Sequence, residues 1–295
     1  MQTINIQFTL FSAFYSPLIS TIASGLLQKE GLEPKWTVAA PGTSALEALH
    51  DGSAHVVQSA LSQGFGAASS SDATEVRHFA QVNEMDGFFL TAHKADPNFE
   101  WKKLEGAKVI LFGAGQPLVM FKYACHKAGI DYNKIEAVHV GGAAAMDKAF
   151  RAGEADYVQQ QGPYPQQLEA DGLGHIVARV GSQIGLCGFS SLAATTQWLK
   201  SDMAKKFIRA YQGARLYLND ATASEIATLQ QPYFPDIELD VLEKCIESYQ
   251  QLSCWTPHVE ITDAAYNATL DIYQQSGGLE TRLAYTDVCS QPPTQ

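Results

Sequence analysis

The first third of the chain alternates between short stretches of strand-like patterning and longer stretches of helical periodicity. Residues 4–10, INIQFTL, alternate apolar and polar positions as a half-buried strand does. Residues 16–31 place apolar side chains at helical spacing and end at Gly31, a residue type typical of helix ends. The same patterning predicts further strands at 33–40, 54–60 and 77–83 and a short helix at 42–52. Strands separated by helices indicate parallel β-α-β units.

A second cycle of the same kind begins after residue 106. Its pattern predicts strands at 107–113, 135–141 and 155–162 and helices at 116–129, 142–153 and 163–172. The stretches PGTSALEALHDGSAHVVQS and VGGAAAMDKAFRAGEADYVQQ correspond piece by piece: a corner of small residues, a helix that ends in glycine, and a short strand. Because their ungapped identity is low, we interpret the repeat as one of topology.

The last third is predicted to be mostly helical, and it is joined to the two cycles without a low-complexity linker. Periodicity of 3.6 residues predicts helices within 195–220, 221–234, 236–252 and 262–277. We expect the chain to cross between the two α/β units near Gly87–Thr91 and again near Gly185–Ser190.

Charge and composition exclude several function classes. The net charge is −11 and no basic stripe is visible, so nucleic-acid binding is not expected. The sequence has no run of about 18 apolar residues that would span a membrane. No signal-peptide pattern is found either, because the first basic residue is Lys29 and no compact apolar region follows it.

Neither a metal site nor a catalytic nucleophile is predicted. The five cysteines lack C-x-x-C spacing, and the eight histidines lack H-x-x-x-H spacing. Cys245 and Cys254 can form one bridge in an exported protein, and buried free thiols are the alternative. Cys187 is the only thiol near the expected crossings, and no histidine is placed beside it. We therefore expect no cofactor, no metal and no catalytic residue.

A colinear series of segments resembles a known family. The segments are SPLISTIASGLLQKEGLEPKW, GTSALEALHDGSAHVV, KKLEGAKVILFGAG, AFRAGEADYV and MAKKFIRAYQGARLYLND. Together they are similar to the substrate-binding proteins of ABC importers, in particular the nitrate/sulfonate/taurine (SsuA-like) group and its NMT1/THI5-like relatives. The resemblance covers nearly the whole chain in order, although no single motif is specific.

The resemblance implies an α/β fold of the periplasmic-binding-protein type (type II-like), with two hinged lobes and a ligand cleft between them. Lobe one would contain residues 1–88 and 189–295, including the C-terminal helices, and lobe two residues 89–188. A small-molecule ligand and a membrane permease are the implied partners, with the protein a monomer. The implied location is periplasmic or otherwise extracytoplasmic, with a cytoplasmic location as the alternative because no leader is visible.

Corners between strand ends and helix starts are the expected ligand contacts. Ligands of open α/β sheets bind outside the carboxyl ends of the strands, where helix N-termini present free N–H groups. Besides Pro41 and Gln58, the candidate ligand-binding residues are Phe14, Tyr15, Ser16, Gly42, Thr43, Ser44, Ser59, Ser62, Asn83, Gly113, Gln116, Gly142, Gln159, Gln161 and Tyr164. The alternative for any one corner is that its glycines and serines only form turns and caps.

None of these corners carries a lysine or an arginine, and this limits the ligand chemistry. Aromatic faces and amides suit a flat aromatic or heterocyclic molecule, whereas a sulfonate would have to rely on N–H groups alone. Packing in the core is the alternative for Phe14 and Tyr15. For the three glutamines 159–161 the alternative is strand alternation, in which one faces the cleft and the others face helices.

Glu84 and Asp86 lie by the first expected crossing, and we interpret them as a solvated pair. Binding a ligand amine, or acting as acid and base in an enzyme, are the alternatives. The sequence thus favours a solute receptor without chemistry of its own. A cytosolic enzyme on the same fold, of desulfinase, decarboxylase or pyrimidine-synthase type, and a small-molecule sensor remain the competing hypotheses.

Overall fold

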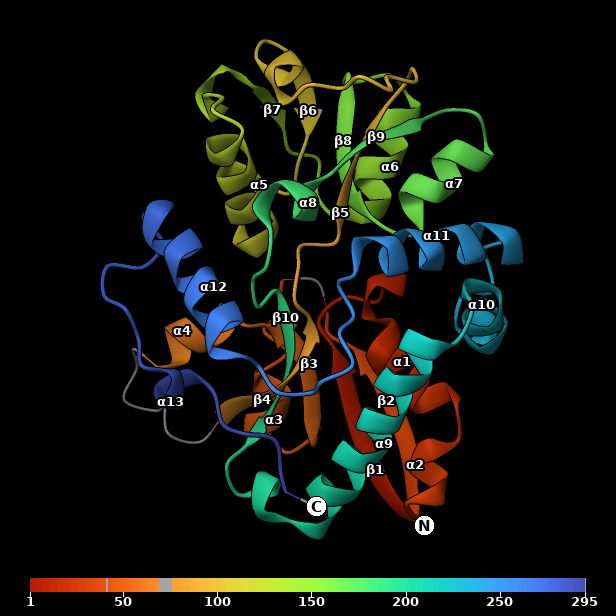
Figure 1. Ribbon diagram of the computed structural model, residues 1–295, viewed down its shortest axis with the longest axis vertical. Coiled ribbons are helices and arrows are strands. Elements are labelled where there is room, and N and C mark those ends of the chain that lie inside the picture. Colours follow the sequence, from red (N-terminus) through yellow and green to blue (C-terminus); the bar gives the residue numbers. More distant parts are fainter. Residues whose placement is uncertain (41, 69–75, 295) are drawn as a thin grey trace.

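The computed structural model describes residues 1–40, 42–68 and 76–294, and it contains two five-stranded sheets, one in each half of the molecule (Figure 1). The order of the first sheet is β2 (Leu32–Val38), β1 (Gln2–Phe8), β3 (Val56–Ala60), β10 (Ser190–Thr195) and β4 (Val76–Asn83). The order of the second is β7 (Glu136–Val138), β6 (Lys108–Ile110), β8 (Tyr157–Gln161), β5 (Phe88–Ala92) and β9 (His175–Arg179).

The two sheets share one topology, which confirms the predicted α/β class. In each sheet three neighbouring strands run parallel, and a fourth, β10 or β5, pairs antiparallel with the strands on both of its sides. The chain reaches these inserted strands where it passes between the two halves. Their antiparallel pairing was not predicted, because the sequence pattern within a strand does not reveal its partner.

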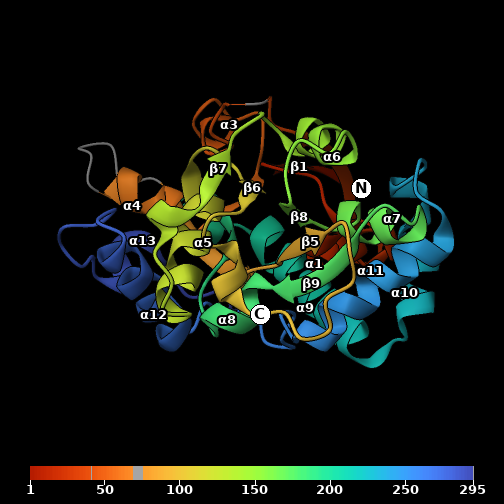
Figure 2. The same ribbon diagram turned by 90° about the horizontal axis from the view of Figure 1, so that it is seen from above.

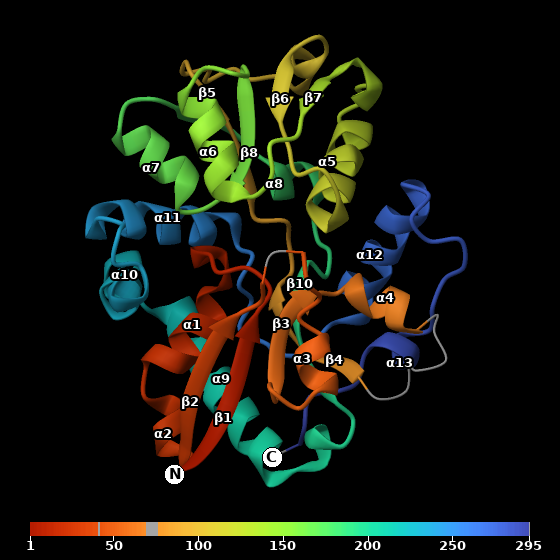
Figure 3. The same ribbon diagram turned by 180° about the vertical axis from the view of Figure 1, so that it is seen from behind.

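The helices cover the sheets and connect their strands (Figures 1 and 3). They are α1 (Ser16–Ala23), α2 (Leu26–Lys29), α3 (Glu47–His50), α4 (Gln63–Ala68), α5 (Gly115–Lys127), α6 (Ala143–Arg151), α7 (Tyr164–Ala170), α8 (Val180–Ile184), α9 (Asp202–Asp220), α10 (Ala223–Gln230), α11 (Leu239–Leu252), α12 (Asp263–Gln275) and α13 (Tyr285–Val288). Among the described residues no helix is long and apolar enough to cross a bilayer.

Three local predictions differ from the structure. The helix expected over 42–52 is only the single turn Glu47–His50, entered at Leu46 instead of at Thr43 or Ser44. The first crossing, between β4 and β5, meets the expected Gly87–Thr91 only at Gly87, because residues 88–91 belong to β5. Three short helices and three strands were not predicted from the sequence: α4, α8, α13, β5, β9 and β10.

The C-terminal helices lie along both halves of the molecule. α9 and α10 pack against α1, beside the first sheet. α11 also contacts α7, and α12 contacts α5, so both helices reach the second half near the crossings (Figures 1 and 2). The division into lobes at residues 88/89 and 188/189 stays a prediction.

The guanidinium of Arg215, on α9, fixes the segment that enters the first crossing. Arg215 is 1% exposed. It donates hydrogen bonds to the backbone carbonyls of Gln81 and Val82, each at 3.1 Å, and to that of Thr256. A buried charge is tolerated where hydrogen bonds replace its hydration. Here those hydrogen bonds join the end of β4 to the segment that follows α11.

The cysteines are all buried and free. Cys125, Cys187, Cys245, Cys254 and Cys289 form no disulfide. Of the two possibilities left open for Cys245 and Cys254, the structure has the buried free thiols and not the bridge.

Candidate ligand-binding cleft

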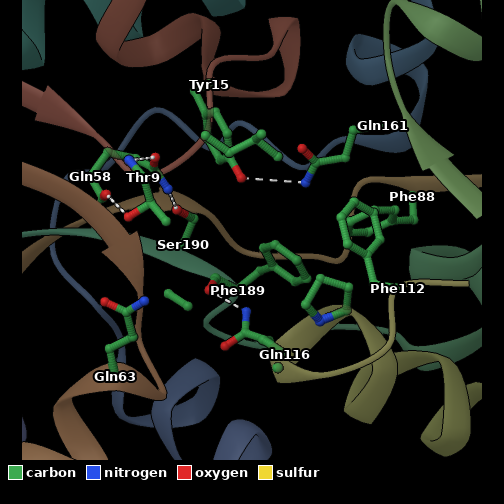
Figure 4. A pocket seen from close by; sticks show the side chains of 14 residues that line it. Thr9, Tyr15, Gln58, Gln63, Phe88, Phe112, Gln116, Gln161, Phe189 and Ser190 are labelled. Carbon is green, nitrogen blue, oxygen red and sulfur yellow. Dashed lines mark hydrogen bonds between the residues drawn. The ribbon is translucent and has the colours of Figure 1, made fainter. Parts of the chain in front are cut away.

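A cavity of about 200 Å³ lies between the two sheets (Figure 4). It is bounded on one side by the residues after β1, by β3 and by the start of β10. On the other side it is bounded by β5, the end of β8 and the first turn of α5. The lining residues are Thr9, Leu10, Tyr15, Gln58, Ala60, Gln63, Phe88, Phe112, Gly115, Gln116, Pro117, Gln161, Phe189 and Ser190.

The lining is aromatic and polar but carries no formal charge. It contains four glutamines, three hydroxyl side chains and three phenylalanines, and no Lys, Arg, His, Asp or Glu. Amides offer both donors and acceptors, and aromatic rings offer flat apolar faces. A cavity of this composition can bind an uncharged flat molecule through stacking and paired hydrogen bonds.

Two of the four glutamines are hydrogen-bonded to the protein through both ends of the amide. The Gln58 oxygen accepts from the Thr9 N–H at 3.2 Å, and its nitrogen donates to the Ser190 hydroxyl at 2.6 Å. The Gln116 oxygen accepts from the Ser62 hydroxyl at 2.8 Å, and its nitrogen donates to the Phe189 carbonyl at 2.6 Å. These amides build the wall of the cavity.

Gln161 and Tyr15 form a polar pair that faces the cavity from opposite halves. The Gln161 nitrogen donates to the Tyr15 hydroxyl at 3.4 Å, whereas the Gln161 oxygen is buried and has no partner among the described residues. Burial raises the pKa of Tyr15 to about 12, against the opposing effect of the Gln161 hydrogen bond, so its phenol stays protonated. An acceptor and a protonated hydroxyl thus lie side by side, and a buried acceptor without a partner favours binding a ligand donor.

A smaller cavity of about 90 Å³ adjoins the first, and the two share four lining residues. Its lining is Leu10, Phe11, Ser12, Phe88, Phe112, Ala143, Gln161, Gly162, Pro163 and Tyr164. Ser12 donates a hydrogen bond to the Gly162 carbonyl at 2.8 Å, so this end of the cleft is bridged by the protein itself.

The structure brings four of the fifteen predicted ligand residues to the cavities. Tyr15, Gln116 and Gln161 line the larger cavity, and Tyr164 lines the smaller one. The residues that line neither are Phe14, Ser16, Gly42, Thr43, Ser44, Ser59, Ser62, Asn83, Gly113, Gly142 and Gln159.

Several residues of this second group have partners within the protein instead. Phe14 is fully buried, and its ring packs against those of Tyr249 and Phe189. Ser16 donates hydrogen bonds to the Ala13 carbonyl and to the Gln230 side chain. Phe14 therefore packs in the core, as the alternative stated for it expected, and the Ser16 hydroxyl is used within the protein.

Other residues of the group lie at the surface or beside residues that line the cavity. Residues 42–44 belong to a surface loop, and Pro41 lies outside the described residues. Ser59 and Ser62 bond to Gln63 and Gln116 respectively, so each supports a lining glutamine.

Sequence reasoning missed most of the aromatic wall. Phe88, Phe112 and Phe189 line the cavity. In the sequence each has apolar neighbours, so a residue of the hydrophobic core is an equally good interpretation of each. Phe88 and Phe189 flank the crossings, and their position there was the available signal. Gln63 was missed because α4 was not predicted.

The acidic pair by the first crossing is buried, so its interpretation as solvated is wrong. Glu84 is 4% exposed and accepts hydrogen bonds from His258 at 3.1 Å and Thr262 at 3.2 Å. Asp86 is fully buried, and one of its oxygens accepts from the Phe88 N–H at 2.7 Å while the other has no partner among the described residues. Burial raises the pKa of Asp86 to about 7.

Among the described residues, no cysteine or histidine lines either cavity. Cys187 is fully buried and lines neither cavity, and burial raises its pKa well above the ordinary value. A thiol in this state is unreactive, because the thiolate is the nucleophile. The described residues also hold no cluster of three or more metal-ligating side chains.

Known proteins share both the sequence pattern and the fold of this chain. The sequence is 26% identical, over 95% of the chain and 85% of the relative, to the protein described as "Putative binding protein YtlA" of Bacillus subtilis (strain 168). The alkanesulfonate-binding protein SsuA from Xanthomonas axonopodis pv. citri, bound to MOPS, has a similar structure, with a TM-score of 0.74, 18% identity and 98% of each chain covered. The desulfurization enzyme DSZB also shares the fold, with a TM-score of 0.67, 11% identity and coverage of 99% of this chain and 97% of that one.

These likenesses establish the periplasmic-binding-protein fold that the sequence predicted. The family model described as "NMT1/THI5 like" matches residues 14–221, which include η1 (Ala13–Tyr15) almost entirely, both crossings and α9. The matched region is more than half of the chain and contains most of the lining of the cavity. The chain therefore belongs to the NMT1/THI5-like family.

Proposed function

We propose that this protein is the solute-binding component of an ABC importer and that its ligand is a small, uncharged aromatic or heterocyclic molecule. The observation that carries the proposal is the cavity between the two sheets, lined by amides, hydroxyls and aromatic rings without a charged side chain. The family and the ligand-binding relatives support a receptor of this type.

Binding would work through closure of two lobes, residues 1–88 with 189–295 and residues 89–188. Each half contributes residues to the cavity, so a ligand gains all of its contacts only when the halves are together. Such a ligand shifts the equilibrium toward the closed arrangement. We expect the closed monomer to deliver the ligand to a membrane permease outside the cytoplasm.

A sulfonate is the less favoured ligand. The Xanthomonas relative was solved with MOPS, a ligand named in its title. In the present cavity no lysine or arginine is available to form a charge-assisted contact with an anion. Desolvating a sulfonate among phenylalanines without such a contact is costly.

Catalysis is likewise disfavoured, although one protein of this fold is an enzyme. Neither cavity is lined by a cysteine, a histidine or a carboxylate, and general acid–base or covalent catalysis normally uses one of these groups. Burial raises the pKa of Tyr15, which lines the larger cavity, to about 12, so its phenol is even harder to deprotonate than an ordinary tyrosine.

A thermal-shift screen of the full chain tests the ligand class. The panel contains neutral pyrimidines, flavin-like rings, aromatic acids, alkyl sulfonates, taurine and nitrate. A ligand present at 1,000 times its Kd stabilises the folded state by about 4 kcal/mol, which is readily seen. We expect shifts with the neutral heterocycles. A shift with sulfonates alone would contradict the proposed ligand class.

Replacing Gln161 with alanine is expected to weaken binding of the screened ligand by about 10- to 100-fold, because the ligand loses a buried hydrogen-bond partner. Gln160→Ala is the matched control. Gln160 is the adjacent amide of β8 and is buried as well, but it lines neither cavity and its nitrogen donates to the Ala143 carbonyl. Calorimetric titration of both variants, with their stabilities measured in parallel, checks the difference. Equal losses of affinity would remove Gln161 from the site.

A further inference from the structure

The Gln116 side chain lines the cavity, yet both ends of its amide are engaged by other parts of the protein. Gln116 is 5% exposed and lies in the first turn of α5, in the second half of the molecule. Its oxygen accepts from Ser62, and its nitrogen donates to the Phe189 carbonyl. The oxygen of Gln161, in contrast, has no partner among the described residues. Among the lining amides, Gln161 thus has an oxygen available to a ligand, whereas both ends of the Gln116 amide already have partners.

The partners of Gln116 belong to the other half and to the second crossing. Ser62 lies between β3 and α4, where the chain leaves the first sheet. Phe189 immediately precedes β10 and follows the passage between the halves. α12, a C-terminal helix, also contacts α5. One amide therefore ties the start of α5 to the first half at the edge of the cavity (Figure 4).

We propose that Gln116 is a latch that holds the two halves closed, and that it acts on ligand affinity through closure instead of through a hydrogen bond to the ligand. The proposal rests on the proposed function, because a latch has a role only where a ligand is enclosed. Opening by rotation of one half would separate α5 from Ser62 and break at least that bond. A fraction of the molecules is then closed before the ligand arrives, and the apparent affinity rises in proportion to that closed fraction.

The size of the effect follows from the hydrogen bonds that opening breaks. One or two hydrogen bonds of ordinary net strength change an equilibrium by roughly 10-fold. Gln116→Ala removes the bond to Ser62 and the bond to Phe189, whereas Ser62→Ala removes only the first. If the two residues act as one latch, the double variant changes closure no more than Gln116→Ala does.

Small-angle X-ray scattering of the ligand-free full chain tests the latch without any ligand. We expect a larger radius of gyration for Gln116→Ala and Ser62→Ala than for the wild-type protein, with cooperative unfolding retained in both. Gln231→Ala is the control, because its amide nitrogen donates to the Phe234 and Ile237 carbonyls within the same segment, away from the cavity. That variant should scatter as the wild type does.

Ligand titration of the same variants completes the test. We expect an affinity loss of about 10-fold for Gln116→Ala, with faster dissociation, and no further loss in the double variant. Unchanged scattering in Gln116→Ala, or effects of the two substitutions that add, would overturn the latch while leaving ligand binding intact. Failure of every compound to bind, with scattering still changed, would instead count against the proposed function alone. If Gln116→Ala fails to fold, scattering and ligand titration of Ser62→Ala provide the same test.

Discussion

Replacing Arg215 with methionine is expected to lower the free energy of unfolding by about 3–5 kcal/mol. Methionine fills a similar volume but donates no hydrogen bond. The carbonyls of Val82 and Thr256 would then be buried without their present donor, at a cost of about 1–3 kcal/mol each, whereas the Gln81 carbonyl keeps the Tyr211 hydroxyl as a donor. Relief from burying the guanidinium charge offsets part of that cost, which is why the expected loss is smaller than the sum.

Arg209 provides a matched control on the same helix. It lies six residues before Arg215 in α9 and pairs with Glu30 near the surface of the molecule. Surface ion pairs contribute little to stability, so Arg209→Met should cost much less than Arg215→Met. Urea unfolding followed by circular dichroism measures both variants, with the slope against urea concentration compared to detect a change in the exposed surface. Equal losses of unfolding free energy in the two variants would show that the buried hydrogen bonds of Arg215 stabilise the protein no more than the surface ion pair of Arg209 does.

Replacing Asp86 with asparagine is expected to stabilise the protein relative to the wild type, increasingly as the pH rises from about 4 to 7. In the folded protein burial raises the pKa of Asp86 from 3.8 to about 7, against the opposing effect of the Phe88 N–H. Between these two pH values the unfolded carboxyl is ionised and the folded one is protonated. The unfolded state therefore binds fewer protons, and wild-type stability falls with rising pH in this window.

The asparagine variant lacks this proton linkage but keeps an oxygen for the Phe88 N–H. The difference in unfolding free energy between variant and wild type should change by up to about 1.4 kcal/mol per pH unit, or roughly 3–4 kcal/mol in total. It should become constant above pH 7. Urea unfolding of both proteins at unit pH steps between 4.5 and 8.5 checks this, because the other titrating groups cancel in the difference. A difference that stays constant with pH would contradict a protonated Asp86 in the folded protein.

Periodicity and the internal repeat predicted most of the elements, because they depend on local alternation and local capping. Residues 4–10 alternate along β1, and the helical periodicity of residues 202–220 matches α9. The inserted strands β5 and β10 depend on pairing between residues far apart in the sequence, such as Leu192 with Gln58. The sequence Ser190–Thr195 is small and weakly patterned, so nothing in it indicates an antiparallel central strand.

The candidate site was only partly predictable, for a related reason. Phe14 and Tyr15 are adjacent in one short 3-10 helix, and the sequence does not distinguish which ring faces the core and which faces the cavity. The structure places Phe14 against Tyr249 of α11, far away in the sequence. Gln58 lies within β3 and Gln161 is the last residue of β8, so both are near strand ends, where the rule that ligands bind at the carboxyl ends of strands applies. Phe88 and Phe189 become lining residues only because the two crossings meet beside the cavity.

The most direct test of the central claim is a calorimetric titration of the full chain with the compound selected by the thermal-shift screen, followed by chromatographic recovery of that compound. We expect one binding site per chain, an affinity at least 10-fold weaker in Gln161→Ala than in Gln160→Ala, and recovery of the compound unchanged. Binding that is indifferent to Gln161, or conversion of the compound into a product, would contradict a receptor that holds an uncharged ligand between its two sheets.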